Sequence, residues 1–189
     1  MRLIRLIAAL GLIGTAACDD PFALGPATST NFVDTLQLYA VNGTSLDQPS
    51  ALVLTTKRTY RLGIDLLPYN FDFLYRIQGD TLPQLVPYGA VAAASGVSGR
   101  SGYQPSTTPF DQILEGQQAG YVTDSATAIA VGDVLFLRSG LPNGCFLLIP
   151  YYAKLRVLEI DAATRSVSFE ILINNNCGYR GLEPGLPEK

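Results

Sequence analysis

The chain has 189 residues, with 13 Lys and Arg, 16 Asp and Glu and no histidine, which gives a net charge of −3. Without histidine, the chain cannot form a Ser-His-Asp triad, a Cys-His dyad or a zinc site with imidazole ligands. Its mildly acidic charge and scattered basic residues argue against nucleic acid as a partner. Hydrophobic residues at 48% and charged residues at 15% indicate a folded chain rather than a disordered one.

The first residues have the pattern of an export signal. Arg2 and Arg5 are the only charged residues before Cys18, and the stretch between Arg5 and Cys18 is apolar or small. This stretch has the length of a signal-peptide core and is shorter than the ~20 residues that a transmembrane helix needs. We therefore expect residues 1–17 to be a signal peptide, with a helix over residues 3–17 that makes few contacts with the rest of the chain.

The sequence Thr15-Ala16-Ala17-Cys18 resembles the lipobox of bacterial lipoproteins, with Thr15 where leucine is commonest. The resemblance implies that a diacylglyceryl group is attached to the Cys18 sulfur, that the chain is cut before Cys18, and that the new amine is acylated. Two or three acyl chains anchor a protein stably in a bilayer. We then expect a protein of the cell envelope of a Gram-negative-type bacterium, anchored to a membrane and facing the periplasm or the exterior. An unmodified Cys18 thiol, in an ordinary secretory signal or in an uncleaved anchor, is the alternative.

Residues 18–33 are expected to form the lipidated N-terminus and a flexible tether, because prolines and small polar residues are frequent there. Asp19 and Asp20 resemble the inner-membrane retention signal of enteric lipoproteins, but the choice between inner and outer membrane stays open. A β-rich globular domain is expected over residues 34–182. Residues 183–189 have no core-forming pattern and are expected to fray.

Alternation of apolar and polar residues predicts strands along the domain. The clearest alternation runs from Phe71 to Ile77, and its aromatic side chains are expected to pack in the core. Further strands are predicted over residues 35–41, 51–56, 59–65, 134–138 and 145–152. The last of these contains Pro150, which implies an edge, a bulge or a bend.

Two segments interrupt the strand pattern. Residues 88–108 are rich in Ala, Ser, Gly and Pro, which predicts a long loop. The loop contains neither a complete nucleophile elbow nor a phosphate-binding loop. Thr108 as an N-cap and Pro109 at the first helical position favour a short helix that ends by Gly116 or Gly120.

The last two strands are expected to form a hairpin over residues 154–173, closed by a turn at residues 161–165. The returning strand brings Cys177 near the segment that begins at Cys145. Since lipidation would use Cys18 of the three cysteines, the other two can pair in an oxidising compartment. We therefore expect a disulfide between Cys145 and Cys177, with two separate buried thiols as the alternative.

These elements together predict an all-β fold. The expected architecture is a single antiparallel β-sandwich or barrel-like domain with at most one short helix, in addition to the signal helix. The oligomeric state is left open by the sequence.

No motif identifies a catalytic or metal-binding residue, and no cofactor is expected. A carboxylate pair, as in glycosidases, is the catalytic arrangement that the lack of histidine leaves open. The acids considered for such a pair are Asp65, Asp72, Asp80, Asp111, Glu115 and Asp133. Their spacing does not single out two of them.

Two functional hypotheses follow from these features. The stretches GDVLFLRS and NNNCGYR resemble uncharacterised exported lipoproteins of environmental bacteria, a resemblance that implies no activity. The first hypothesis is a non-catalytic, lipid-anchored binding or structural module that contacts an envelope protein or a glycan, with ten tyrosines available for contact surfaces. The alternative is a carboxylate-dependent hydrolase that acts on polysaccharide.

Overall fold

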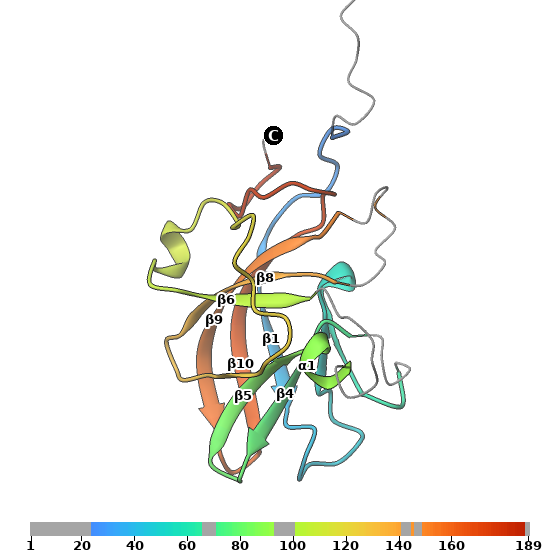
Figure 1. Cartoon of the computed structure of the whole chain (residues 1–189), viewed down its shortest axis with the longest axis vertical. Coiled ribbons are helices and arrows are strands. Elements are labelled where there is room, and N and C mark those ends of the chain that lie inside the picture. The colour runs from blue at the N-terminus through green and yellow to red at the C-terminus, as the bar shows by residue number, and fades with distance from the viewer. Residues whose placement is uncertain (1–23, 66–70, 93–100, 141–144, 146–148, 188–189) are drawn as a thin grey trace, which may run out of the picture.

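The structure, a computed structural model, describes residues 24–65, 71–92, 101–140, 145 and 149–187. These residues form two five-stranded antiparallel sheets (Figure 1). The first sheet has the order β1 (Val33–Tyr39), β10 (Ser166–Asn174), β9 (Tyr152–Asp161), β8 (Val134–Arg138) and β6 (Gly102–Ser106). The second has the order β3 (Arg58–Tyr60), β2 (Ala51–Val53), β4 (Phe73–Gln78), β5 (Leu82–Pro87) and β7 (Thr127–Ala128).

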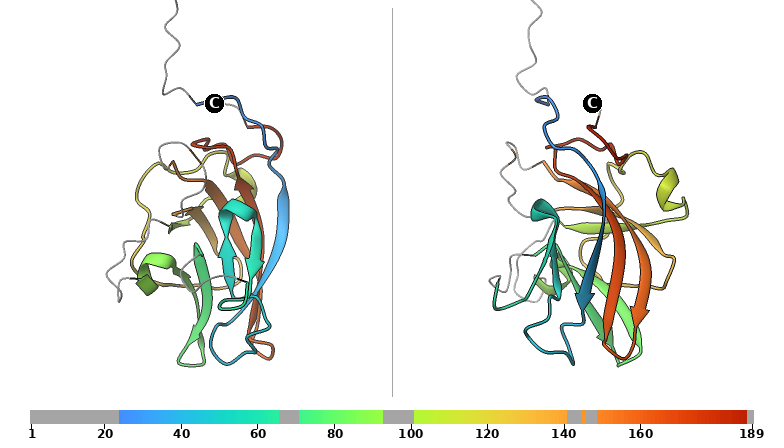
Figure 2. Two further views of the ribbon diagram at one scale, coloured as in Figure 1. Left: turned by 90° about the vertical axis from the view of Figure 1, so that its right-hand side faces the viewer. Right: turned by 180° about the vertical axis from the view of Figure 1, so that it is seen from behind.

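The two sheets face each other as the layers of a sandwich (Figure 2). Both contribute fully buried side chains to the core between them, among them Leu38, Tyr75, Leu85, Leu137 and Leu155. The predicted all-β fold class is therefore confirmed. In the described part of the chain, the helical elements are η1 (Leu54–Thr56), α1 (Tyr88–Ala92) and η3 (Phe110–Gln112).

The predicted C-terminal hairpin is confirmed in position. Strands β9 and β10 pair along their length, with Ile171 opposite Leu155, and a bulge between Ser168 and Phe169. The side chains of alternate β10 residues, including Phe169 and Ile171, enter the core between the sheets. Leu172 points to the other face of the same sheet, where it is also fully buried.

Both sheets are covered on their outer faces as well, and this explains why several strands do not alternate cleanly. On the first sheet, Phe136 and Leu172 pack against Phe110 and Leu182. On the second sheet, a separate cluster includes Phe71, which the sequence analysis placed in one stripe with the core aromatics. A strand buried on both faces reads as a near-continuous apolar run.

The segment over residues 88–108 is not a single long loop. It begins with the helix α1 and ends in the edge strand β6, which pairs with β8 from Gly102 opposite Arg138 to Ser106 opposite Val134. Residues 93–100, between them, lie outside the described residues.

The expected helix after Thr108 is wrong. Only η3 forms, Pro109 occupies its N-cap, and no side chain caps it. The chain then becomes extended because Gly116 N donates to Arg180 O at 2.7 Å. Pairing with a distant segment thus replaces the helical hydrogen bonds that local sequence favoured.

The structure also corrects both ends of the domain. Residues 24–33 are held against the sandwich by hydrogen bonds and are not a free tether, and Gly185 pairs with Asn31 rather than fraying.

The expected signal helix over residues 3–17 and the Cys18 position lie outside the described residues. Within the described ranges, no helix has the length and hydropathy needed to cross a bilayer.

Two leucine-to-alanine substitutions test which side chains of β9 face the core. Leu155→Ala should lower the free energy of unfolding by about 3 kcal/mol, because it opens a cavity in the core. Leu158→Ala, in the same strand but 40% exposed, should cost less than about 1 kcal/mol. Equilibrium unfolding in guanidinium measures both, and equal losses would contradict the assignment.

Candidate functional site

The candidate functional site is the end of the sandwich where the N-terminal segment enters and the C-terminal segment leaves (Figure 1). We call residues 24–33 the entry segment and residues 179–187 the C-terminal strap. Cys18, the expected lipidation position, precedes the first described residue, Leu24, by six residues. This end is therefore the one that a lipid on Cys18 would hold nearest the membrane.

Asn31 joins the entry segment to the C-terminal strap. Its backbone N–H donates to Gly185 O at 2.7 Å, and Gly185 N donates back to Asn31 O at 2.9 Å. The Asn31 side-chain amide donates to the carbonyls of Gly181 at 3.1 Å and Glu183 at 3.2 Å. From the end of β10, the Asn174 amide also donates to Gly181 O at 2.8 Å. The strap is thus attached both to the entry segment and to the first sheet.

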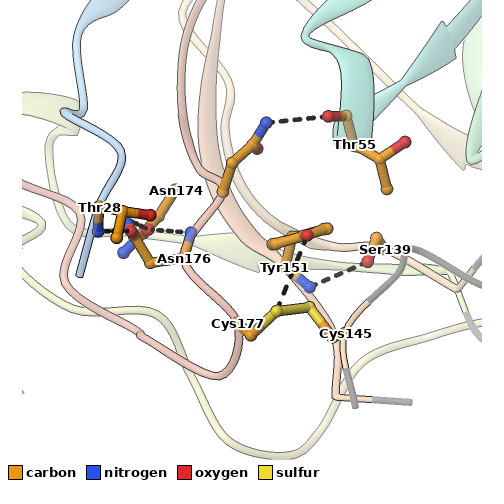
Figure 3. Close-up of a disulfide and its surroundings, with 9 residues drawn as sticks. Thr28, Thr55, Ser139, Cys145, Tyr151, Asn174, Asn176 and Cys177 are labelled. Carbon is orange, nitrogen blue, oxygen red and sulfur yellow. Dashed lines mark hydrogen bonds between the residues drawn. A yellow bond between two sulfur atoms is a disulfide. The ribbon is translucent and has the colours of Figure 1, made fainter. Parts of the chain in front are cut away.

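Asn176 holds the entry segment a little earlier in the chain (Figure 3). Its Oδ1 accepts from the backbone N–H groups of Thr28 at 2.8 Å and Ser29 at 2.9 Å. Its Nδ2 donates to Ser29 O at 2.7 Å and to Asn174 Oδ1 at 2.8 Å. Because Asn176 is buried, these bonds satisfy an amide that would otherwise destabilise the fold.

The predicted disulfide lies next to this amide cluster (Figure 3). Cys145 and Cys177 are bonded, with their Cα atoms 5.6 Å apart, within the usual range for a disulfide. The Tyr151 hydroxyl lies 3.9 Å from the Cys177 sulfur, and burial raises the pKa of the Tyr151 phenol. The bridge ties the segment before β9 to the residue that follows Asn176, so it stabilises the same end of the sandwich.

A buried lysine positions the third segment of the site. Lys154, in β9, is 3% exposed, and its ammonium group donates to the carbonyls of Phe110 and Ile113, both at 2.9 Å. Its nitrogen also lies 4.5 Å from the centre of the Phe110 ring. Burial lowers the pKa of Lys154, while nearby carboxylates act in the opposite direction. These contacts fix η3 on the sheet and direct residues 114–118 toward the C-terminal strap.

Residues 114–118 and the strap form the walls of an open cleft of about 700 Å³. Leu182 N donates to Leu114 O at 2.7 Å, and Arg180 forms an ion pair with Glu115. Leu114 and Leu186 remain 55% and 59% exposed on this cleft. The lining is Leu24, Leu114, Glu115, Gln118, Gly178, Tyr179, Arg180, Gly181, Glu183, Pro184, Leu186 and Pro187.

The acids considered for a catalytic pair are distributed over separate elements, and each has its own partner. Four form ion pairs with arginine, and two accept hydrogen bonds from backbone N–H groups. The ion pairs are Asp65 with Arg61, Asp80 with Arg165, Asp111 with Arg156, and Glu115 with Arg180. The backbone donors are Leu54 and Gly140 to Asp72, and Ala130 to Asp133.

Among these acids, the pKa of Asp65 is shifted by its contacts. Hydrogen bonds from Arg61 lower the pKa of Asp65 to about 2, which disfavours a general-acid role at neutral pH. Arg156 forms ion pairs with both Asp111, at 3.5 Å, and Glu170, so one guanidinium is shared by two acids from different elements. No group of three or more metal-ligating side chains occurs among the described residues.

The asparagines are the part of the site that the sequence analysis missed. It placed Cys145 and Cys177 together correctly, but it did not predict that Asn174 and Asn176 bind segments remote in sequence. A run of three asparagines beside a cysteine was the available signal.

Comparison with known protein families, with curated proteins and with solved structures found no match.

The role of Asn176 in holding the entry segment is tested by Asn176→Ala. The variant should expose the Thr28 and Ser29 amides to exchange at least roughly tenfold faster, because each net hydrogen bond is worth about 1 kcal/mol. Asn175→Ala is the matched control, since Asn175 donates to Thr55 O elsewhere in the fold. Hydrogen exchange read by NMR gives both rates, and unchanged protection in Asn176→Ala would refute the assigned role.

The disulfide is tested by the double variant Cys145→Ser, Cys177→Ser. The bond closes a loop between residues 32 apart, so its loss should lower the free energy of unfolding by roughly 3–4 kcal/mol in the chain-entropy model. Denaturant unfolding of the oxidised protein and the variant gives the difference. The Ser139→Ala variant keeps the bridge and controls for substitution near it; a double variant as stable as the oxidised protein would contradict the expectation.

Proposed function

We propose that the protein is a lipid-anchored protein of the bacterial cell envelope, attached to a membrane by acyl chains on Cys18, with its β-sandwich facing the periplasm or the exterior. One observation carries the proposal. The bond between Cys145 and Cys177 leaves Cys18, at the end of an apolar run, as the remaining cysteine of the three in the chain. A disulfide also suits an oxidising compartment outside the cytoplasm.

The short connection to Cys18 supports the same proposal. Because the sandwich holds the entry segment by hydrogen bonds at Gly25 and Thr28, only residues 18–23 connect a lipid on Cys18 to Leu24, the first described residue. Six residues span at most about 20 Å. An anchor of this length keeps the domain at the membrane surface, where a module that contacts envelope components would act.

For a protein at this location in the cell envelope, we propose a non-catalytic binding or structural role, with an envelope protein or a glycan as the partner. The alternative hydrolase on polysaccharide requires two carboxyl groups that face each other across a cleft. Glu115 and Glu183 both line the cleft, but Glu115 is held in an ion pair with Arg180. The ion pair occupies the Glu115 carboxylate and so favours the non-catalytic role.

The anchor is tested by intact-mass spectrometry of the protein purified from the envelope of a Gram-negative host. The expected mass is that of residues 18–189 with a diacylglyceryl group and, where the amine is acylated, one further acyl chain. Cys18→Ala is the control and should remain at the mass of the unlipidated chain. A wild-type protein without added lipid mass would overturn the proposal.

A further inference from the structure

The cleft at the anchored end gathers three leucines from three separate parts of the chain. Leu24 comes from the entry segment, Leu114 from the segment after η3, and Leu186 from the C-terminal strap. Backbone pairing of Leu182 with Leu114 and of Asn31 with Gly185 brings these segments together. Leu114 and Leu186 are more than half exposed. We call the three leucines the apolar rim of the cleft. Clustered exposed apolar side chains mark an interaction surface, whereas single ones do not.

The length of chain before Leu24 limits what can lie against this rim. Residues 18–23 reach at most about 20 Å, and the cleft includes Leu24 itself. With acyl chains on Cys18, Leu24 therefore lies within that distance of the bilayer, and the cleft that Leu24 lines lies at the same end of the domain. The turns at the opposite end of the sandwich, where Asn42 contacts Arg165 and Arg165 pairs with Asp80, lie on the far side of the folded domain (Figure 1).

The charges of the cleft indicate which lipid surface would suit it. Arg180 is neutralised by Glu115, and Glu183 adds a negative charge. The lining therefore has no excess positive charge to attract anionic headgroups. Leucine side chains on an otherwise polar surface enter the boundary between headgroups and acyl chains without such attraction.

We propose that this end of the sandwich lies on the membrane, with Leu114 and Leu186 inserted into a zwitterionic lipid interface beside Leu24. This inference rests on the proposed anchor at Cys18. The contact orients the domain, so that the strand turns at the opposite end face away from the bilayer. The leucine contact binds the membrane weakly by itself. It forms because the acyl chains on Cys18 keep the leucines close to the membrane surface.

The chain contains no tryptophan, so a single introduced tryptophan reports its own position. Leu114→Trp and Leu186→Trp are the test variants, and Leu46→Trp is the control. Leu46 is 70% exposed and belongs to the connection between β1 and β2, at the end opposite the termini (Figure 1). Each full-length, lipidated variant is reconstituted into phosphatidylcholine vesicles with or without bromine on the acyl chains.

Brominated lipid should reduce the emission of Leu114→Trp and Leu186→Trp roughly twofold, because an interfacial side chain lies ~5–10 Å into the headgroup and acyl boundary. The emission of Leu46→Trp should not change. Equal quenching of all three variants, or no quenching of the two test variants, would overturn the inference. Agreement between the two test variants guards against a local folding defect in either.

Flotation of the same samples separates the inference from the proposed function. A protein that floats with the vesicles but shows no selective quenching is anchored without this contact, which overturns the inference and leaves the proposed function standing. A protein that does not float contradicts the anchor at Cys18 and the inference together.

Discussion

The attachment of the entry segment to the C-terminal end of the chain is the constraint on which the rest of the structure depends. Asn176 and Asn31 satisfy backbone groups of segments about 150 residues apart in sequence. They set where β1 begins on the edge of the first sheet and where the strap crosses that sheet. The strap in turn places Leu182 in the outer cluster and completes the cleft. The disulfide at Cys177 reinforces the same point.

This arrangement defines how the proposed anchor would act on the domain. A flexible tether would let the sandwich rotate freely and stand away from the bilayer. Here the covalent path from Cys18 enters a folded structure at Leu24, and further hydrogen bonds at Gly25 and Thr28 hold it there. A force on a lipid at Cys18 would therefore be transmitted to one end of the sandwich, and that end carries the exposed leucines.

The sequence predicted the elements whose signals are local. The hairpin of β9 and β10 and the strand β8 have clear apolar patterns, and the parity of the cysteines predicted the bond between Cys145 and Cys177. Strand β5 was missed because it contains Pro83 and Pro87. The sheet tolerates these two prolines because β7 pairs only with Gln84 and Leu85, which lie between the prolines. The asparagine contacts were missed for a different reason, since each side chain finds its partners in a segment that is remote in sequence.

The distance between the domain and the bilayer tests the central claim most directly. Neutron reflectometry of the lipidated protein on a supported bilayer measures where protein density begins above the headgroups. A folded entry segment predicts protein density within about 20 Å of the headgroups, the reach of six residues. A hydrated gap of about 50 Å, which residues 18–33 could span only if all of them were extended, would contradict the account.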